Sequence, residues 1–315
     1  QRSLKEDVIE EALDRMAGIK LRPTVEAAPG DDEANGLHYR TRVQLHVDEA
    51  GTVGPYRERS HEVIRVRDLP LAVDEIRELE MQNKNFQDVR KIEVSASSTG
   101  QVQWRIDNKV KGDERLVERA AGRTFRISGG GFWQVHKKAA DVLAACVIDM
   151  VAAVGIDKEA DNLDLYGGVG LFTSALAGKF GKDLRMTSVE SFRQATDDAT
   201  LNLSDLSKVK AVCAPVERFL NEKVGNRDKG GKPASPSAAT VVLDPPRAGA
   251  GAKVVDQLLA VGPNHIIYVA CDPVALARDL KPLLAGGYEL KSLRAFDLFP
   301  HTHHVEAVAS LVRKN

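Results

Sequence analysis

LDLYGGVGLF, residues 163–172, is the stretch that decides the fold of this chain. Residues 162–166 are an apolar run typical of a buried strand, and a helical pattern follows the glycines. Glycines at a strand-to-helix turn let a ligand approach the backbone closely. A tight turn without a ligand is the alternative. The stretch therefore predicts an α/β fold with a candidate ligand turn, and it leaves the ligand open.

The same alternation of strand and helix extends on both sides of this turn. Further short strands are predicted at 185–189, 240–243 and 265–270, and a helix is predicted at 137–154. This order is typical of a mostly parallel, doubly wound sheet. Residues 225–240 are rich in Gly, Pro, Ser and Lys, so we expect a mobile loop there. We predict one α/β domain over residues 126–315.

Residues 1–125 have a different pattern, which predicts a smaller α+β domain. Apolar residues recur at helical spacing over 3–18, and residues 23–35 contain turn formers. Alternation with a period of two predicts strands at 39–47, 63–67, 92–97 and 102–106, with a helix at 71–84. Arg40, Arg42, Gln44 and His46 share one face of the first strand, and this face is a candidate contact for nucleic acid, with an ordinary solvated strand face as the alternative.

Composition excludes several classes of protein. The formal net charge is -1, so any nucleic-acid contact must use local positive charge. The three cysteines form no CxxC pair, which argues against a zinc site or a redox pair. No apolar run approaches the roughly 18–20 residues of a membrane span, and a cytoplasmic protein is expected. From the start at Gln1, without an initiator Met, we expect a fragment or a trimmed chain, and the presence of a further N-terminal domain stays open.

Glu190 ends the strand that follows the glycine turn, where an acidic side chain can accept both hydroxyls of a ribose. Dehydrogenases use an acid in the same place, so the pair indicates an adenosine-containing cofactor without choosing one. A strict G-x-G-x-x-G pattern for a pyrophosphate would need glycine at position 173, which is Thr173. The departure favours S-adenosylmethionine.

Two later strands end in residues that could bind a ligand or take part in catalysis. Asp244 precedes two prolines at the carboxyl edge of the sheet, where doubly wound folds bind ligands, although an ordinary turn is the alternative. Cys271 ends the next strand, just before Pro273 and a helix. A lone cysteine is often a small buried hydrophobe, but a helix N-terminus lowers a thiol pKa and favours a nucleophile.

Three histidines and Glu306 lie close together near the C-terminus. A metal site at His301 and His304 would need helical spacing, which Pro300 argues against. We therefore predict no metal site, and we interpret Glu306 as a general base in the same cleft as Cys271.

Together these residues resemble the bacterial RNA 5-methyluridine methyltransferases, which act on transfer RNA or 23S ribosomal RNA. The likeness covers nearly the whole chain. The motifs that carry it are Phe132-Trp133-Gln134, residues 164–172, Val189-Glu190, residues 244–249, residues 269–279 and residues 299–306. The resemblance implies a class I (Rossmann-like) methyltransferase domain behind a smaller central domain. Relatives often carry an N-terminal barrel called TRAM, which residues 1–315 lack.

The resemblance also implies roles for individual residues. It makes Cys271 the nucleophile and Glu306 the base, with Gln134 at the cofactor or the target base. The cofactor-binding residues that it implies are Gln134, Tyr166, Gly168, Gly170, Leu171, Glu190 and Asp244. Two departures stand out: Asp272 replaces a common Asn, and Pro215 removes an expected adenosine contact. Leu69 replaces the cysteine that some relatives use for an iron–sulfur cluster, so no cluster is expected.

The chemistry of uracil explains why a thiolate and a carboxylate are needed. Thiolate addition to C6 makes C5 enolate-like, so that C5 can take a methyl group, and a base must then remove the C5 proton. The target uridine must leave the base stack to be reached. Methyl transfer to a protein or a small molecule, and an inactive RNA-binding relative, are the alternatives. A monomer is expected, and the choice between transfer RNA and ribosomal RNA stays open.

Overall fold

The computed structural model describes residues 1–107, 109–225 and 239–314, and it divides the chain into two compact units. The larger unit holds residues 1–28, 121–123 and 141–315, and the smaller holds 29–120 and 124–140. The predicted boundary at 125/126 therefore differs from the observed division. Residues 1–28 belong with the larger unit because β1 (Val25–Ala27) pairs with β14 (Tyr288–Asp297) of its sheet. Most of the predicted loop at 225–240 falls on residues 226–238, outside the described residues.

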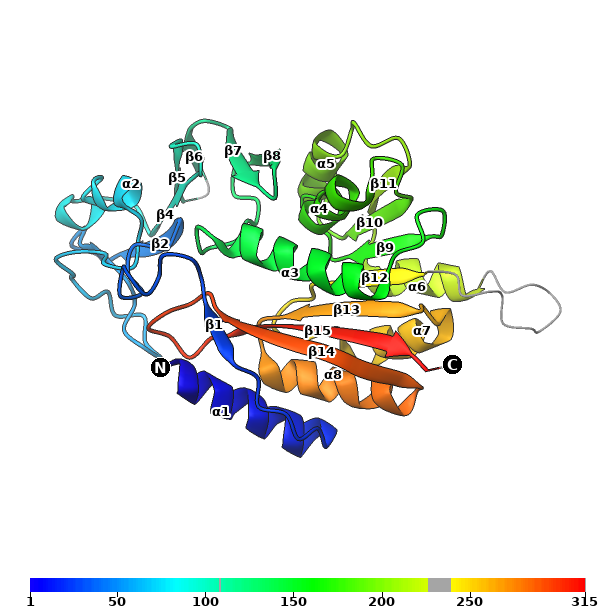
Figure 1. The fold of residues 1–315 in the computed structure, drawn as a ribbon. Helices are drawn as coiled ribbons and strands as arrows, with labels where there is room; N and C mark the ends of the chain where they lie inside the picture. Colours follow the sequence, from blue (N-terminus) through cyan, green and yellow to red (C-terminus); the bar gives the residue numbers. More distant parts are fainter. Residues whose placement is uncertain (108, 226–238, 315) are drawn as a thin grey trace. The chain divides into compact units, whose positions relative to one another are not determined.

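The larger unit is built on a sheet of eight strands in the order β1-β14-β15-β13-β12-β9-β10-β11 (Figure 1). The central strands are β9 (Asn162–Leu165), β10 (Met186–Glu190), β11 (Val209–Cys213), β12 (Thr240–Leu243) and β13 (His265–Ala270). These five run parallel to one another, whereas β15 (Glu306–Arg313) is antiparallel to both of its neighbours. The predicted α/β fold with a mostly parallel sheet is confirmed.

Burial explains why the central strands are short and apolar. Every residue of β9, β12 and β13 is buried, as expected for parallel strands that are covered on both faces. The helices of this unit are α3 (Ala139–Val154), α4 (Leu171–Phe180), α5 (Arg193–Asn202), α6 (Val216–Gly225), α7 (Gly251–Val261) and α8 (Pro273–Ala285). None of the helices in the described parts of the chain is long and apolar enough to cross a membrane.

The N-terminal helix confirms the prediction for residues 3–18. It consists of α1 (Arg2–Ala12) and a π-helical turn, η1 (Leu13–Ala17), and it ends at Gly18, whose φ of 70° suits glycine. Ile9 and Leu13 are buried in the same core as Leu280 of α8. The prediction of a plain loop at 23–35 was wrong for β1, a strand of three residues whose partner β14 lies far away in sequence.

The smaller unit contains an antiparallel sheet in the order β3-β2-β4-β5-β6 and a separate pair, β7-β8. Their bounds are β2 (Arg42–Val47), β3 (Val53–Gly54), β4 (Lys91–Ala96), β5 (Val102–Ile106), β6 (Lys109–Gly112), β7 (Arg115–Ala120) and β8 (Arg123–Ser128). Leu45, Ile76, Met81 and Ile92 belong to its core. The strands predicted at 39–47, 92–97 and 102–106 are confirmed.

Two predictions in the smaller unit were wrong. Residues 63–67 form no strand, because Val63 makes only an isolated bridge to Tyr56 and Ile64 is 37% exposed. The helix predicted at 71–84 is reduced to α2 (Asp74–Arg77) and a 3-10 turn, η2 (Met81–Asn83). Glu80, between them, has a φ of 47°, which interrupts a right-handed helix.

Candidate active site

Two glycines of the turn after β9, Gly167 and Gly170, have no room for a side chain. A Cβ on Gly167 would lie 2.1 Å from Ser188 Oγ, and one on Gly170 would lie 2.8 Å from Leu203 Cδ1. Gly168 and Gly170 have φ values of 53° and 92°, which glycine adopts without strain. Tyr166 has a φ of 61°, an unusual conformation for a bulky residue. Steric contacts and positive φ values therefore favour glycine at positions 167, 168 and 170.

The contacts of Thr173 explain why position 173 is not the glycine of a G-x-G-x-x-G motif. Its backbone N–H and its hydroxyl both donate to Asp164 Oδ2, at 3.1 and 2.7 Å. Asp164 is fully buried, and burial raises its pKa to about 6. The threonine thus fixes the start of α4 to the end of β9, in a position where glycine would leave the buried carboxylate with fewer donors.

Glu190 lies beside this turn, at the end of β10. One carboxylate oxygen accepts from Gly168 N at 3.2 Å, and the other accepts from Phe192 N at 2.8 Å. Backbone donors hold the carboxylate in place while its remaining lone pairs stay available to ribose hydroxyls. Phe192 is 75% exposed and offers an apolar surface two residues further on. Leu171 begins α4 behind the turn. These groups fit an adenosine.

The loop that carries Asp244 is fastened to α8. Asp279 Oδ2 accepts from Ala250 N at 2.8 Å and from Tyr268 OH at 2.7 Å. Arg278 Nη2 donates to Ala248 O at 2.6 Å. A Cβ on the intervening glycine, Gly249, would come within 2.6 Å of both helix side chains. The loop between β12 and α7 is therefore held in one conformation.

Cys271 follows β13 and immediately precedes α8. Asp272 caps this helix by accepting from Ala275 N at 2.8 Å. The thiol is half-buried, and its pKa is raised to about 11 by burial and by the charges of Glu306 and Asp244, while Arg247 lowers it. The expectation of a lowered thiol pKa at a helix N-terminus was wrong in direction. Burial and two carboxylates outweigh the helix end.

Glu306 is the first residue of β15 and is 6% exposed. Burial, followed by the charge of Asp244, raises its pKa well above that of an ordinary carboxyl, and Arg247 lowers it. Burial and Asp164 raise the pKa of Asp244 to about 7. Within residues 1–107, 109–225 and 239–314, neither Asp244 nor Glu306 has a hydrogen-bonded side-chain oxygen. The structure thus brings the predicted nucleophile and the predicted base into one electrostatic cluster with Asp244 and Arg247.

A buried lysine from the N-terminal helix holds the segment that leads to Glu306. Lys5 is 4% exposed, and its Nζ lies 2.5 Å from Asp297 Oδ1. The same ammonium donates to Phe299 O at 3.1 Å and to His304 O at 2.7 Å. His304 Nε2 in turn lies 3.1 Å from Arg247 Nη2. The histidine segment is thus fixed by a cation, and the described residues contain no cluster of three possible metal ligands.

Sequence reasoning did not single out Phe192, Arg247 or Lys5. The sequence does contain an indication for Phe192. A large apolar residue just after the acid that ends a strand lies outside the buried strand, so it is a candidate for contact with a ligand. Arg247 was noticed only as part of its motif, although it is the one cation within Asp-Pro-Pro-Arg. Lys5 carried no signal, since its partners lie about 300 residues away in sequence.

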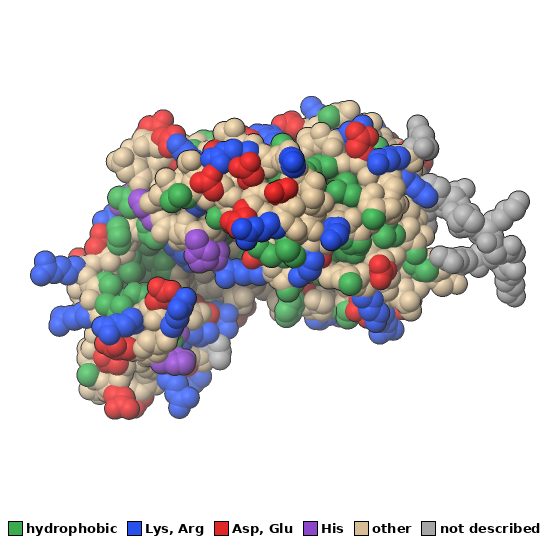
Figure 2. All heavy atoms as spheres, turned by 90° about the horizontal axis from the view of Figure 1, so that it is seen from below, with side chains coloured by type: hydrophobic (Ala, Val, Ile, Leu, Met, Phe, Trp, Pro, Cys, Tyr) green, Lys and Arg blue, Asp and Glu red, His purple; other side chains and the backbone are tan. Residues whose placement is uncertain are grey.

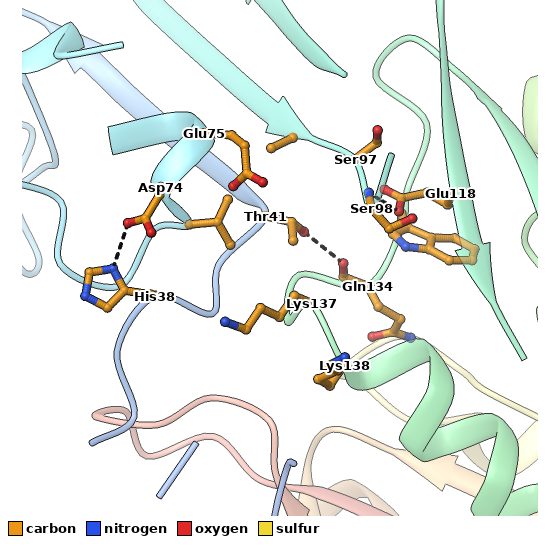
Figure 3. Close-up of a pocket in the computed structure, with 13 residues that line it drawn as sticks. His38, Thr41, Asp74, Glu75, Ser97, Ser98, Glu118, Gln134, Lys137 and Lys138 are labelled. Carbon is orange, nitrogen blue, oxygen red and sulfur yellow. Dashed lines mark hydrogen bonds and ion pairs between the residues drawn. The ribbon is translucent and has the colours of Figure 1, made fainter. Parts of the chain in front are cut away.

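Gln134 lies in the smaller unit, so it is not among the residues that the larger unit brings together. It lines a cavity of about 360 Å³ within its own unit, together with Thr41, Glu118 and Lys137 (Figure 3). Thr41 Oγ1 donates to the carbonyls of Gln134 and Val135, at 3.4 and 2.9 Å, which fixes the backbone there.

The predicted basic face on β2 is only partly free. Arg42 Nη1 donates to Gly131 O at 2.6 Å, and His46 stacks on Tyr56 with ring centroids 3.5 Å apart. Arg40 and Gln44 line a second cavity of about 220 Å³ in the same unit. Figure 2 shows Lys and Arg interspersed with Asp and Glu on the visible face, without one continuous basic patch. Positive charge is therefore local, as the net charge requires.

Comparisons with known proteins point in one direction. A model of the tRNA (uracil-5-)-methyltransferase family matches residues 76–314. The chain is 38% identical to an uncharacterized RNA methyltransferase of Streptomyces avermitilis, over 99% of this chain and 77% of that protein. It is 36% identical to an uncharacterized RNA methyltransferase of Bifidobacterium longum, over 97% of this chain and 74% of that protein.

A solved structure shares the fold. The tRNA (uracil-54, C5)-methyltransferase of Pyrococcus abyssi, determined in complex with S-adenosyl-L-homocysteine, superposes with a TM-score of 0.73. That match covers 99% of this chain and 84% of the other at 22% identity. At this identity the likeness speaks for the fold alone, and it confirms the predicted class I methyltransferase architecture.

Proposed function

Because the chain belongs to the tRNA (uracil-5-)-methyltransferase family, we propose that Cys271 Sγ bonds to C6 of the target uracil during methyl transfer. The enzyme is an S-adenosylmethionine-dependent RNA methyltransferase that acts at C5 of uridine. The observation that carries the proposal is the pairing of Ala270 with Ala307, which places Cys271 and Glu306 at the same end of the adjacent strands β13 and β15. The charges of Asp244 and Arg247 act on both groups. Direct methyl transfer to nitrogen or oxygen would need no such thiol.

Each bond change has a group in this cluster that serves it. The thiol proton is released to solvent, and the charge of Arg247 favours the thiolate that remains. The sulfur then forms a bond to C6, and the C5=C6 electron pair moves toward C5 and the O4 carbonyl. Bound S-adenosylmethionine would supply the methyl group that C5 takes, with S-adenosylhomocysteine as the leaving group. Glu306 removes the C5 proton, the C5=C6 bond forms again and the thiolate leaves C6.

The raised pKa of Glu306 suits the last proton transfer. A carboxylate with a low pKa is a weak base, whereas burial and Asp244 make Glu306 a stronger one. Glu306 also sits on a strand that is hydrogen-bonded on both sides, so its side chain is rigidly placed. These features support Glu306 as the base.

The other predicted site residues receive roles at the cofactor. Glu190 would accept the ribose hydroxyls. Phe192, which was not predicted from the sequence, would offer its exposed ring to the adenine. Gly168, Gly170 and the backbone of Leu171 let the cofactor approach the turn, while Tyr166 and Asp244 border it. The resemblance assigns Gln134 to the cofactor or the target base. These roles rest on the resemblance and on the positions described above.

A trapped intermediate tests the assignment of the base. In Glu306→Gln, the thiolate can still add and the methyl group can still transfer, but the C5 proton stays and blocks release of the thiolate. Incubation with S-adenosylmethionine and substrate RNA should give a protein–RNA adduct that survives denaturing electrophoresis. The matched control is Glu289→Gln, an exposed glutamate on β14, which should turn over normally without an adduct.

Adding Cys271→Ala to Glu306→Gln should remove the adduct completely. Normal turnover by Glu306→Gln would show that another group is the base, with His301 or His303 as the next candidates. An inactive variant that binds RNA and cofactor but forms no adduct would place Glu306 before proton removal.

The class of RNA and the cellular setting belong to the same proposal. We propose either transfer RNA or ribosomal RNA as substrate, read by a cytoplasmic monomer, with contacts that include Arg40 and Gln44. Comparing 5-methyluridine at individual positions in RNA from cells with and without the protein identifies the target. If cells without the protein keep 5-methyluridine at every position, the proposed activity is contradicted.

A further inference from the structure

The cavity of the smaller unit has a size and a lining that the proposed cofactor and uracil contacts explain only at Gln134. Its volume of about 360 Å³ falls in the range of small-ligand sites. Its walls come from five separate segments of that unit, and its polar members include Thr41, Ser98, Glu118, Gln134 and Lys137. Figure 3 shows these side chains gathered around one space, with Glu118 beside Ser98.

Glu118 is the unusual member of this lining. It is 3% exposed, and Oε2 accepts from Ser98 N at 2.9 Å. The second oxygen, Oε1, is buried and accepts no hydrogen bond in the described part of the chain. The charge of Arg42 acts on Glu118, but no hydrogen bond joins the two groups. A buried carboxylate oxygen without a donor is costly, so a donor from a ligand would stabilise it.

The groups around Glu118 define what such a ligand must carry. Trp133 lines the cavity and is braced by Phe125, with ring centroids 5.2 Å apart. Gln134 has no side-chain hydrogen bond within the described residues, so its amide is available to donate and to accept. The ammonium groups of Lys137 and Lys138 are exposed, and neither has an ion pair in the described ranges. The ligand therefore combines a planar ring, an edge of donors and a negative charge.

A guanine nucleotide meets all three requirements. Guanine presents two adjacent donors, N1–H and the 2-amino group, on its Watson–Crick edge, and a carboxylate accepts from both. Adenine has an acceptor at N1, and uracil places acceptors on both sides of its single donor. Single-stranded RNA is recognised through such edges and through aromatic contacts, and lysines neutralise its phosphates.

We propose that this cavity binds a guanine base of the substrate RNA, outside the target uridine, with Glu118 as the group that reads its donor edge. The inference rests on the proposed function in one respect, namely that the ligand belongs to an RNA substrate. Asp74 and Glu75 also line the cavity and repel phosphate, so the phosphate must approach from the side of Lys137 and Lys138.

Binding of mononucleotides tests the site without any methyl transfer. The chain has two tryptophans, so Trp104→Phe leaves Trp133 as a fluorescent reporter inside the cavity. Titration of this full-length variant with guanosine 5′-monophosphate should give a saturable change. Inosine 5′-monophosphate, which lacks the 2-amino group, and adenosine 5′-monophosphate should bind at least about tenfold more weakly.

Substitution of the recognition group completes the test. Glu118→Gln should weaken guanosine monophosphate binding about ten- to hundredfold and abolish the preference over inosine monophosphate. Glu114→Gln, the same change at an exposed position outside the cavity, should leave both unchanged. Equal binding of the three nucleotides, no saturable change, or an unaltered Glu118→Gln variant would each overturn the proposal.

A methylation assay separates this site from the proposed activity. With a substrate RNA in which inosine replaces guanosine outside the stem, KM should rise at least about tenfold for the wild type while kcat is kept. Glu118→Gln should show no further change with inosine. If wild-type KM is unaffected, the guanine site fails and the methyltransferase stands. If guanosine monophosphate binds but no RNA is methylated, the proposed function fails and the site stands.

Discussion

The two halves of the carboxyl edge of the large sheet differ in how many hydrogen bonds their carboxylates accept. On the side of β9 and β10, Asp164 and Glu190 accept hydrogen bonds from Thr173 and from backbone N–H groups. On the side of β12 and β13, Asp244 and Glu306 have no hydrogen-bond donors in the described part of the chain, and both pKa values are raised. The first half holds its carboxylates with fixed donors before any ligand arrives, although Asp164 Oδ1 has no partner in the described residues and the pKa of Asp164 is also raised, to about 6. The second half has no such donors within the described ranges.

The difference separates binding from chemistry. A paired carboxylate gives a fixed acceptor that suits a ribose, and it contributes to stability. An unpaired carboxylate with a raised pKa exchanges protons near neutral pH and costs stability. Single substitutions in each half should therefore affect either catalysis or cofactor binding, but not both.

Cys271→Ala should abolish catalysis and leave the cofactor half intact. Thiolate addition enables the methyl transfer, so we expect a loss of at least ~10³-fold in kcat/KM. Affinity for S-adenosylmethionine, measured by calorimetry, should be nearly unchanged. Cys213→Ala, at an exposed cysteine on β11, is the matched control. Substantial turnover by Cys271→Ala would remove the thiol from the mechanism.

Lys5→Met should destabilise residues 297–306, the segment that leads to Glu306. It leaves Asp297 buried without its cation, which costs about 3 kcal/mol in the free energy of unfolding. Urea denaturation measures the loss, and Lys20→Met, at an exposed lysine, should show none. Asp297→Asn in the Lys5→Met background should recover part of the loss. An unchanged unfolding midpoint would mean that solvent reaches Asp297.

Glu190→Ala should affect the cofactor half alone. Hydrogen bonds from ribose hydroxyls to a charged acceptor contribute roughly 1.5–3 kcal/mol, so the Kd for S-adenosylmethionine should rise about ten- to hundredfold. The comparison is sharpest with Glu222→Ala, at an exposed glutamate on α6. Unchanged affinity by calorimetry would show that the ribose is held elsewhere.

Asp244→Asn should stabilise the free enzyme, with an effect that depends on pH. The folded-state pKa of Asp244 is about 7, above its ordinary value of 3.8, so the folded state binds more protons between these values. Wild-type stability therefore falls as pH rises through this window, and the variant should lose this fall. After screening by solvent we expect a gain of about 1 kcal/mol above pH 7. Parallel stability curves for the two proteins across this range would contradict the raised pKa.

Much of the larger unit was predictable because its signals are local. A buried parallel strand is a short apolar run, and the turn after β9 needs glycine for steric reasons that act within a few residues. Cys271 and Asp244 were identified because each ends such a strand. The prediction at 63–67 failed because alternation alone does not supply a partner strand, and the helix at 71–84 failed at Glu80, where the chain turns left-handed.

The sequence by itself determined the order of strands and helices, the glycine turn and the residues with the chemistry for methyl transfer. The pKa values and the buried contacts of those residues depend on the tertiary structure. Burial and the approach of Glu306 and Asp244 raise the Cys271 pKa to about 11, although a helix N-terminus lies next to the thiol. Lys5 reaches Asp297 and His304 from the other end of the chain. Local patterns follow from backbone geometry, whereas electrostatic energies depend on which distant charges fold into the same dry space.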